Sequence, residues 1–387
     1  MNTYKCRCCD NELYSSPLFC FKNMPSSAQG MPSKNELSSD KPIDLDLYQC
    51  PKCGLIQFVC EPVSYYKDVI RSTGFTSTMT EVRRNEYKSF IKDYNLDKKK
   101  IIEIGCGQGE YLSILNEYDV NAYGIENNID LCEIASKNHL KVFNGYVTDN
   151  YLIQEGPFDA FVCFNYLEHQ ANPNSFLSGI FNNLKEESYG LITVPDFNFI
   201  LDNGGFYEFI RDHIVYYNMN SFCYVLEKNG FNVLSCDISN GDTLIARVKK
   251  KTKTDISILK KSYINLNNEY KNYILNIKND SSLKYGGKIA VWGASHQSFA
   301  LLQMLEIYKD IEYIIDSAPF KQGKYSPASH IIIKSPEEIH SNPVDSILII
   351  APTYANEISE IIKNKYKEVS SIYSIKGNNL VELLSIN

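Results

Sequence analysis

The sequence predicts an α/β protein with an N-terminal zinc-binding module, a central Rossmann-like domain and a smaller Rossmann-like domain at the C-terminus. Paired cysteines in the first sixty residues predict the first part. Short apolar runs that alternate with amphipathic stretches predict the second, and the same alternation resumes after residue 287. A chain of 387 residues has room for two or three domains, each with its own core.

Changes in composition place the domain boundaries. Residues 1–62 are loop-rich, 63–250 form the central domain, 251–280 form a charged surface helix that bridges two domains, and 281–387 form the last domain. Expected strands are 101–105, 121–126, 158–164, 189–194, 288–295, 311–316 and 345–352, and expected helices include 110–118, 174–184, 298–308 and 356–366.

Composition excludes several classes of protein. The net charge of -7 offers no attraction for a polyanion, so we expect no nucleic-acid partner. No run approaches the roughly 18 apolar residues that span a bilayer, and the first thirty residues lack the apolar region of a signal peptide. We therefore expect a cytoplasmic protein without a membrane span.

A glycine-rich turn follows the first strand of the central domain. Glu103 is followed by Gly105, Cys106, Gly107 and Gly109 and then by a helix, a G-x-G-x-G pattern rather than the G-x-G-x-x-G of pyrophosphate loops. Glu126 ends the next strand, where a carboxylate can accept both hydroxyls of a ribose. The pair predicts a site for a nucleoside cofactor without phosphates; the alternative is a plain strand-to-helix turn.

Two C-x-x-C pairs stand 40 residues apart in the N-terminal module. Cys6, Cys9, Cys50 and Cys53 supply the four thiolates of a structural zinc site, and small turn residues flank the second pair. Cys8 is the rival to Cys6 or Cys9 as a ligand. Cys20 and Cys60 lack a C-x-x-C partner and are expected to be buried apolar residues.

The glycine turn and its acid resemble the S-adenosylmethionine site of class I methyltransferases. The resemblance implies that the amino-acid part of the cofactor lies beside Glu103–Gly109, the ribose on Glu126 and the adenine near Gly145 and Tyr146. The implied cofactor-binding set is Glu103, Gly105, Cys106, Gly107, Gly109, Glu126, Asn127, Gly145, Tyr146 and Asn165.

The whole chain resembles the three-domain sugar methyltransferases, best known as C-methyltransferases of nucleotide-linked deoxysugars. Three segments carry this likeness: residues 48–57 (YQCPKCGLIQ), the glycine turn, and residues 315–327 (IDSAPFKQGKYSP). The last segment, with its D-x-x-P-x-K-Q-G-x-Y-x-P pattern, is the most specific.

In that family a histidine acts as, or assists, the general base, and the resemblance assigns this role to His213, with Asp212 before it. Two tyrosines of the family pattern are replaced here by Ile210 and Ile70. A second candidate pair, Glu168 and His169, follows the strand 158–164 at the sheet edge where ligands bind in α/β proteins. An imidazole suits either role because its pKa of about 6.5 allows proton removal near neutral pH.

Other residues leave their roles open. Arg211 could pair with a substrate phosphate or with a local acid, and Lys321 could contact a phosphate or be a turn residue. The resemblance implies that His296 or Gln297 helps to line a substrate cleft; the alternative is a structural turn. Tyr65, Tyr66, Tyr207, Tyr216 and Tyr217 lie in segments expected to flank the acceptor, where most should serve packing.

We hypothesise a methyltransferase that uses S-adenosylmethionine and acts on a nucleotide-linked sugar or related glycan precursor. His213, or else His169, would remove a proton from the acceptor carbon, oxygen or nitrogen. The alternatives are an NAD-dependent oxidoreductase of a sugar nucleotide and a non-catalytic zinc-ribbon binding protein with a degenerate core.

Overall fold

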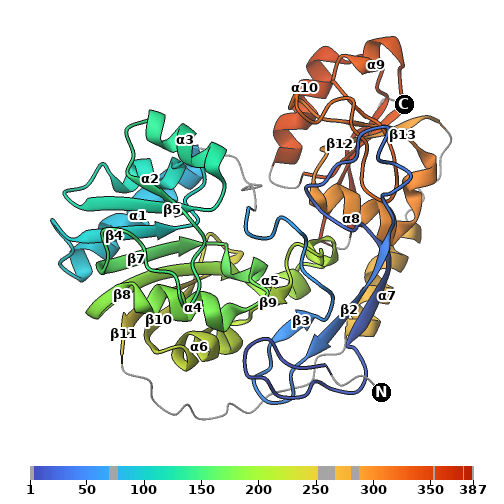
Figure 1. The fold of residues 1–387 in the computed structure, drawn as a ribbon. Helices are drawn as coiled ribbons and strands as arrows, with labels where there is room; N and C mark the ends of the chain where they lie inside the picture. The colour runs from blue at the N-terminus through green and yellow to red at the C-terminus, as the bar shows by residue number, and fades with distance from the viewer. Residues whose placement is uncertain are drawn as a thin grey trace.

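The computed structural model describes residues 4–68, 77–251, 266–279, 287–351, 354–377 and 379–385. Three sheets organise them, and Figure 1 shows the N-terminal strands beneath the C-terminal part, with the central sheet beside both. No helix among these residues is both long enough and apolar enough to cross a membrane.

The N-terminal module contains an antiparallel sheet with the strand order β1-β2-β3-β9. Its strands are β1 (Phe19–Met24), β2 (Ile43–Gln49), β3 (Ile56–Phe58) and β9 (Val215–Tyr216). This sheet was not predicted, although Leu45 and Leu47 alternate with aspartates along β2 as a half-buried strand requires. Its last strand comes from far along the chain, so sequence-local patterns give no sign of the pairing.

The central part is a seven-stranded mixed sheet with the order β10-β11-β8-β7-β4-β5-β6. Strands β4 to β8 run parallel, whereas β10 and β11 are antiparallel neighbours. The predicted strands at 101–105, 121–126, 158–164 and 189–194 all fall within it. Its strands are β4 (Lys100–Ile104), β5 (Asn121–Glu126), β6 (Val142–Asn144), β7 (Phe158–Phe164), β8 (Leu184–Pro195), β10 (Phe231–Ser239) and β11 (Thr243–Lys250).

Helices connect these strands and bury the apolar residues on one side of each. They are α1 (Ser77–Asp93), α2 (Glu110–Leu115), α3 (Ile129–Lys137), α4 (Pro173–Asn182), α5 (Phe197–Asp202) and α6 (Met219–Lys228), with the short turns η1 (Leu167–His169) and η2 (Phe206–Glu208). Strands β4 and β7 are almost continuously buried, as the central strands of a parallel sheet must be.

The C-terminal part has a six-stranded sheet with the order β14-β13-β12-β15-β16-β17, parallel except for the edge strand β17. Its strands are β12 (Ile289–Trp292), β13 (Ile311–Ile315), β14 (Ile333–Lys334), β15 (Ser346–Ile349), β16 (Ser371–Lys376) and β17 (Asn379–Ser385). Its helices are α8 (His296–Leu305), η4 (Ile307–Asp310), α9 (Glu338–Ser341) and α10 (Ala355–Lys365).

The structure describes part of the expected bridging helix. Within the expected 251–280 segment, residues 252–265 and 280 lie outside the described residues, and α7 spans Leu266–Asn279. One face of this helix is buried and the other lies at the surface: Tyr273 and Ile277 are fully buried, whereas Leu275 is 53% exposed. The reason is that Tyr270 and Tyr273 contact Phe206, and Tyr270 also contacts Phe19 and Phe21 of the N-terminal sheet.

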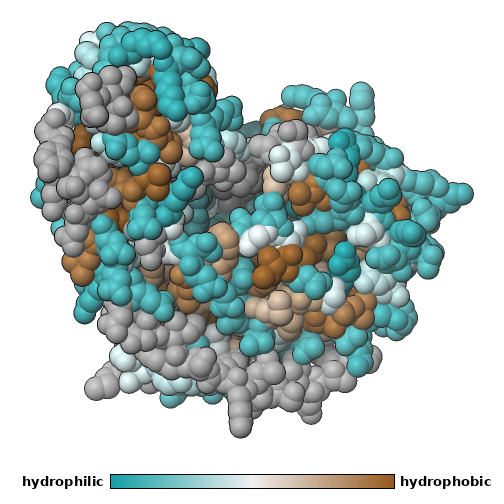
Figure 2. Space-filling view, turned by 180° about the vertical axis from the view of Figure 1, so that it is seen from behind, coloured by the Kyte–Doolittle hydropathy of each residue, from teal (hydrophilic) through white to brown (hydrophobic). Residues whose placement is uncertain are grey.

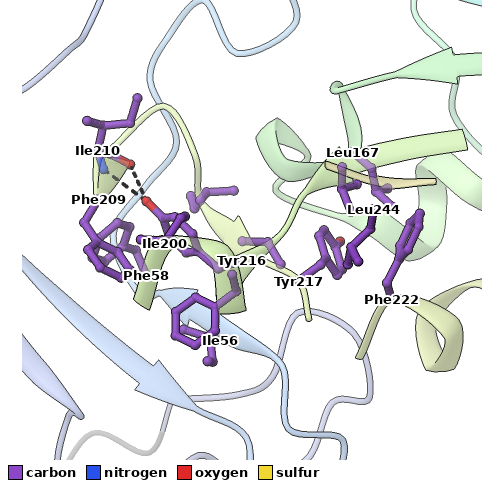
Figure 3. Packing of buried hydrophobic residues seen from close by; sticks show 14 of the residues in the cluster. Ile56, Phe58, Leu167, Ile200, Phe209, Ile210, Tyr216, Tyr217, Phe222 and Leu244 are labelled. Atoms are coloured by element: carbon purple, nitrogen blue, oxygen red, sulfur yellow. Dashed lines mark hydrogen bonds between the residues drawn. The ribbon is translucent and has the colours of Figure 1, made fainter. Parts of the chain in front are cut away.

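An aromatic cluster joins the N-terminal sheet to the central part. Phe21 stacks on Phe209 with ring centroids 5.0 Å apart and meets Phe58 edge-on at 6.3 Å. Figure 3 shows Tyr216 reaching into this cluster, while Tyr217 points the other way toward Phe222. The packing role expected for most of the tyrosines holds for these two.

Replacing the buried ring of Phe21 should destabilise the junction. We expect Phe21→Ala to lower the free energy of unfolding by about 3–5 kcal/mol, because it leaves a cavity among aromatic rings. Denaturant unfolding followed by tyrosine fluorescence measures the change. Phe320→Ala is the control, because Phe320 is 67% exposed and should change stability by no more than about 0.5 kcal/mol. Equal effects of the two substitutions would contradict this account of the junction.

Candidate functional site

The glycine turn connects β4 to α2 at the carboxyl edge of the central sheet. Gly105, Gly107 and Gly109 have φ angles of 71°, 58° and 90°, a region that disfavours other residues. A Cβ added at Gly107 would meet only the Glu110 carboxylate within 4 Å, so the backbone is open on that side. A Cβ added at Gly105 would lie 3.2 Å from the Tyr166 ring.

Glu126 is held at the end of β5 by backbone amides. Its carboxylate accepts hydrogen bonds from Gly107 N at 3.0 Å and from Asn128 N at 2.9 Å. Burial raises the pKa of this carboxyl, while the amides of Asn128 and Gly107 oppose the rise. The glycine turn and the acid on the neighbouring strand are therefore in direct contact, through the hydrogen bond from Gly107 N to the Glu126 carboxylate.

The remaining residues of the predicted cofactor set lie on the same edge, with different contacts. Glu103 and Cys106 are buried, and Gly145 N bonds to Glu126 O at 2.9 Å. Asn127 donates to the Asp68 carboxylate. Asn165 is exposed, but its side-chain oxygen accepts from the Thr193 hydroxyl at 2.8 Å and is thereby turned toward β8.

A segment just before the central sheet forms one wall of this edge. The Tyr166 hydroxyl donates to Lys67 O at 2.9 Å, and the Lys67 ammonium lies 4.7 Å from the centre of the Tyr146 ring. The Tyr146 hydroxyl donates to the buried side chain of Gln170. The sequence analysis did not predict these roles of Lys67, Tyr166 and Gln170. Their contacts join segments that are far apart in the chain, and no short sequence pattern indicates such contacts.

The two predicted histidines lie side by side at the same sheet edge. The rings of His169 and His213 meet edge-on with centroids 4.8 Å apart. His169 Nδ1 bonds to the carbonyl oxygen of Asp212 at 2.7 Å, and its Nε2 faces Glu168 Oε1 at 3.9 Å. Burial lowers the pKa of His169 to about 4 and that of His213 well below 6.5, so both rings are neutral at pH 7.

The C-terminal part reaches this histidine pair through the start of α8. His296 lies 6.4 Å from the His213 ring centre, and its Nε2 faces Glu208 Oε2 at 3.3 Å. Gln297 donates to the other oxygen of Glu208 at 2.5 Å. Figure 2 shows the molecule hollowed between its two lobes.

Asp212 and Arg211 attach the histidine loop to the N-terminal module. The Asp212 carboxylate accepts from the Tyr65 hydroxyl at 2.7 Å and from Ala28 N at 2.8 Å. Arg211 donates to the carbonyl oxygens of Ser26 and Glu61. Arg211 therefore holds the loop before His213 against the N-terminal module. In the C-terminal part, the Lys321 ammonium forms an ion pair with the Asp316 carboxylate at 2.9 Å. Ile210 is buried, whereas Ile70 lies outside the described residues.

The four predicted thiols converge in the N-terminal module. The sulfurs of Cys6, Cys9, Cys50 and Cys53 all lie within 4.8 Å of one another, with 3.4 Å between Cys6 and Cys53 and 3.5 Å between Cys9 and Cys50. Backbone amides of Cys9 and Cys53 face the sulfurs of Cys6 and Cys50. Cys8 is buried outside this group.

Two family models match the chain. Residues 79–236 match a methyltransferase domain, and residues 254–373 match a C-methyltransferase C-terminal domain. The chain is also similar to the C-methyltransferase NovU of Streptomyces niveus, with 20% identity over 384 residues that cover 92% of this chain and 91% of the relative.

Solved structures resemble somewhat less than half of the chain. A methyltransferase of Thermotoga maritima that depends on S-adenosylmethionine is 18% identical, with a TM-score of 0.35, and the likeness covers 45% of this chain and 93% of that one. A second, from Clostridium acetobutylicum, is 12% identical, with a TM-score of 0.37, over 48% and 96% of the two chains.

The chain is an S-adenosylmethionine-dependent methyltransferase. The family matches span both the glycine turn and the histidine pair, and they set aside the oxidoreductase and the non-catalytic ribbon as alternatives.

Proposed function

We propose that this methyltransferase transfers its methyl group to a nucleotide-linked sugar or a related glycan precursor, with His213 as general base. The observation that carries the proposal is the pair of imidazole rings, His169 after β7 and His213 before β9, 4.8 Å apart, with His296 of α8 6.4 Å from the His213 ring. The similarity to the C-methyltransferase NovU over nearly the full length favours carbon as the methylated atom.

The residues of the glycine turn fit S-adenosylmethionine. The open backbone at Gly107 leaves room for a ligand, and the amides that hold Glu126 leave carboxylate lone pairs for the ribose hydroxyls. Glu103 to Gly109 would hold the amino-acid part, with Asn127, Gly145, Tyr146 and Asn165 around the nucleoside. When bound, the cofactor supplies a methyl group on a positively charged sulfur.

His213 is better suited than His169 to take the proton of the acceptor. His169 uses Nδ1 for the Asp212 carbonyl and turns Nε2 toward Glu168, whereas the His213 ring forms no hydrogen bond with the described residues. His213 is also only half-buried. A neutral imidazole in this position can accept a proton from a carbon, hydroxyl or amine held beside the cofactor.

Removing the charge of Glu126 should weaken cofactor binding. We expect Glu126→Gln to raise the Kd for S-adenosylmethionine on the order of 10- to 100-fold, since a hydrogen bond to a charged group contributes about 1.5–3 kcal/mol. Isothermal titration calorimetry measures it. Glu133→Gln on α3, whose side chain is 63% exposed, is the matched control and should leave Kd unchanged. An unchanged Kd in the Glu126 variant would remove Glu126 from the site.

A screen of acceptors tests the proposed function. Purified enzyme and S-adenosylmethionine are incubated with a panel of nucleotide sugars, and mass spectrometry should reveal one product heavier by a methylene group. His213→Ala should lower kcat on the order of 10²- to 10⁴-fold with an unchanged cofactor Kd. His340→Ala, exposed on α9, is the control. Full turnover by His213→Ala would exclude His213 as the base, and no product across the panel would count against the acceptor class.

We also propose that Cys6, Cys9, Cys50 and Cys53 hold a structural zinc ion. Four sulfurs at about 2.3 Å from zinc lie ~3.8 Å apart, close to the separations of 3.4 and 3.5 Å here. The facing amides of Cys9 and Cys53 favour thiolates.

The zinc site predicts a definite metal content. Wild-type protein should carry about one zinc ion per chain. Inductively coupled plasma mass spectrometry measures this content. Cys53→Ser should lose most of it and unfold at a lower temperature, because metal binding is coupled to folding of the module. Cys20→Ser, outside the group, should retain the metal. Wild-type protein without zinc, or a Cys53 variant with full zinc, would overturn the assignment.

A further inference from the structure

We propose that Glu168, His169 and His213 form a second metal site, which binds a divalent first-row transition-metal ion, Zn²⁺ first among them, and that this ion blocks methyl transfer. The site itself follows from the arrangement of the three side chains. Only its consequence for turnover rests on the proposed function, in which His213 removes a proton from the acceptor. A nitrogen lone pair that binds an ion cannot accept that proton, so the loaded enzyme lacks its base.

The three side chains converge on one point. One ligand atom from each, a carboxylate oxygen of Glu168 and a ring nitrogen of each histidine, all lie within 4.8 Å of one another. Glu168 Oε1 and His169 Nε2 are 3.9 Å apart, which is too far for a hydrogen bond. Two ligand atoms that each lie about 2.0–2.2 Å from one zinc ion are separated by up to about 4.4 Å. The separations therefore fit side chains that share an ion after shifts of about half an ångström.

His169 already has the orientation of a metal ligand. A carbonyl oxygen only accepts hydrogen bonds, so the Nδ1 that lies 2.7 Å from Asp212 O carries the ring hydrogen. In the neutral ring the lone pair is then on Nε2, the atom that faces Glu168. Metal-bound histidines almost always donate their other ring N–H to a carbonyl or carboxylate oxygen, which fixes the ring. The Asp212 carbonyl supplies this contact.

Glu168 provides a second observation that points to a ligand. The residue is 3% exposed, and its Oε2 has no hydrogen-bond partner among the described residues. A buried carboxylate without a partner costs free energy, and a cation beside it offsets this cost. Binding of the ion displaces any proton that the carboxyl carries, because the ligands of a metal are deprotonated.

The donor atoms select the class of ion. Two imidazole nitrogens and one carboxylate oxygen suit Zn²⁺ and its divalent first-row neighbours, whereas Mg²⁺ and Ca²⁺ prefer oxygen ligands. Three protein ligands leave a fourth position open for water. His213 is only half-buried, and its ring forms no hydrogen bond with the described residues. An ion can therefore enter past this ring without breaking a hydrogen bond of the ring.

Zinc titration tests the site without any methyl acceptor. Protein that carries about one zinc ion per chain in the cysteine group is titrated with zinc chloride, and calorimetry should show about one further ion per chain. Glu168→Gln and His169→Ala should each raise the Kd of this second ion at least ~10-fold, since even contacts outside the ligand set contribute that much to affinity. Unchanged zinc in the cysteine group verifies that the variants fold.

His340→Ala is the matched control. His340 also faces two acids, Glu337 and Glu368, but lies at the surface, so its loss should leave the Kd of the second ion unchanged. Three results would overturn the site: no second ion in wild type, the wild-type Kd in both ligand variants, or loss of the ion in His340→Ala, which would show an adventitious ion only.

Cobalt spectroscopy tests the ligands in the wild-type protein, so its outcome does not depend on how a variant folds. One equivalent of Co²⁺, added to protein whose cysteine group holds zinc, should give only the weak visible bands of nitrogen and oxygen coordination. Strong near-ultraviolet bands of cobalt bound to sulfur, without the weak bands, would place the ion on cysteines and overturn the site.

Turnover tests the consequence for catalysis. With the acceptor found by the screen, saturating zinc should lower wild-type kcat on the order of 10²-fold, with half of the effect at the Kd of the second ion. Compared with its own rate without zinc, Glu168→Gln should need at least ~10-fold more zinc for the same fractional loss. The two proposals fail separately. Absence of a second ion overturns the metal site and leaves the base in place, whereas a bound second ion with undiminished turnover overturns the block and removes His213 as the base.

Discussion

The site depends on how Asp212 is held. Its carboxylate receives hydrogen bonds from Tyr65 and from the Ala28 amide, and its carbonyl oxygen receives one from His169. Asp212 therefore connects three segments by hydrogen bonds: the N-terminal module, the loop that carries His213, and the turn after β7. Since Asp212 is 3% exposed, none of these bonds has to compete fully with water.

Burial also sets the chemistry of the titratable groups. It lowers the pKa of both histidines and raises that of Glu168, because burial disfavours the charged form of each group. Glu126 is less affected because two backbone amides partly compensate its charge. Burial thus raises the pKa of both carboxyls, and backbone amides oppose the rise at each of them.

The C-terminal part and the N-terminal sheet both contact the loop that leads to His213. Glu208 binds His296 and Gln297 of α8, and Phe21 packs on Phe209 only one residue further along the chain. In Figure 1 the N-terminal strands and α7 run together beneath α8, which explains how three parts converge on one loop. A rigid frame around the loop suits a reaction that needs donor and acceptor aligned.

The sequence by itself determined the parts whose signal is local. The glycine turn, the acid one strand later and the two C-x-x-C pairs were predicted at the residues where the structure brings them together, because turn conformation and ligand spacing are properties of short segments. The buried strands followed from their apolar runs for the same reason. Only the tertiary structure decided that β9 completes the N-terminal sheet and that Tyr273 of α7 packs against the central part. It alone also decided that Arg211 binds carbonyl oxygens of the N-terminal module and that Glu168 lies beside His169. Those contacts join residues far apart in the chain, and their energies depend on burial that no local pattern encodes.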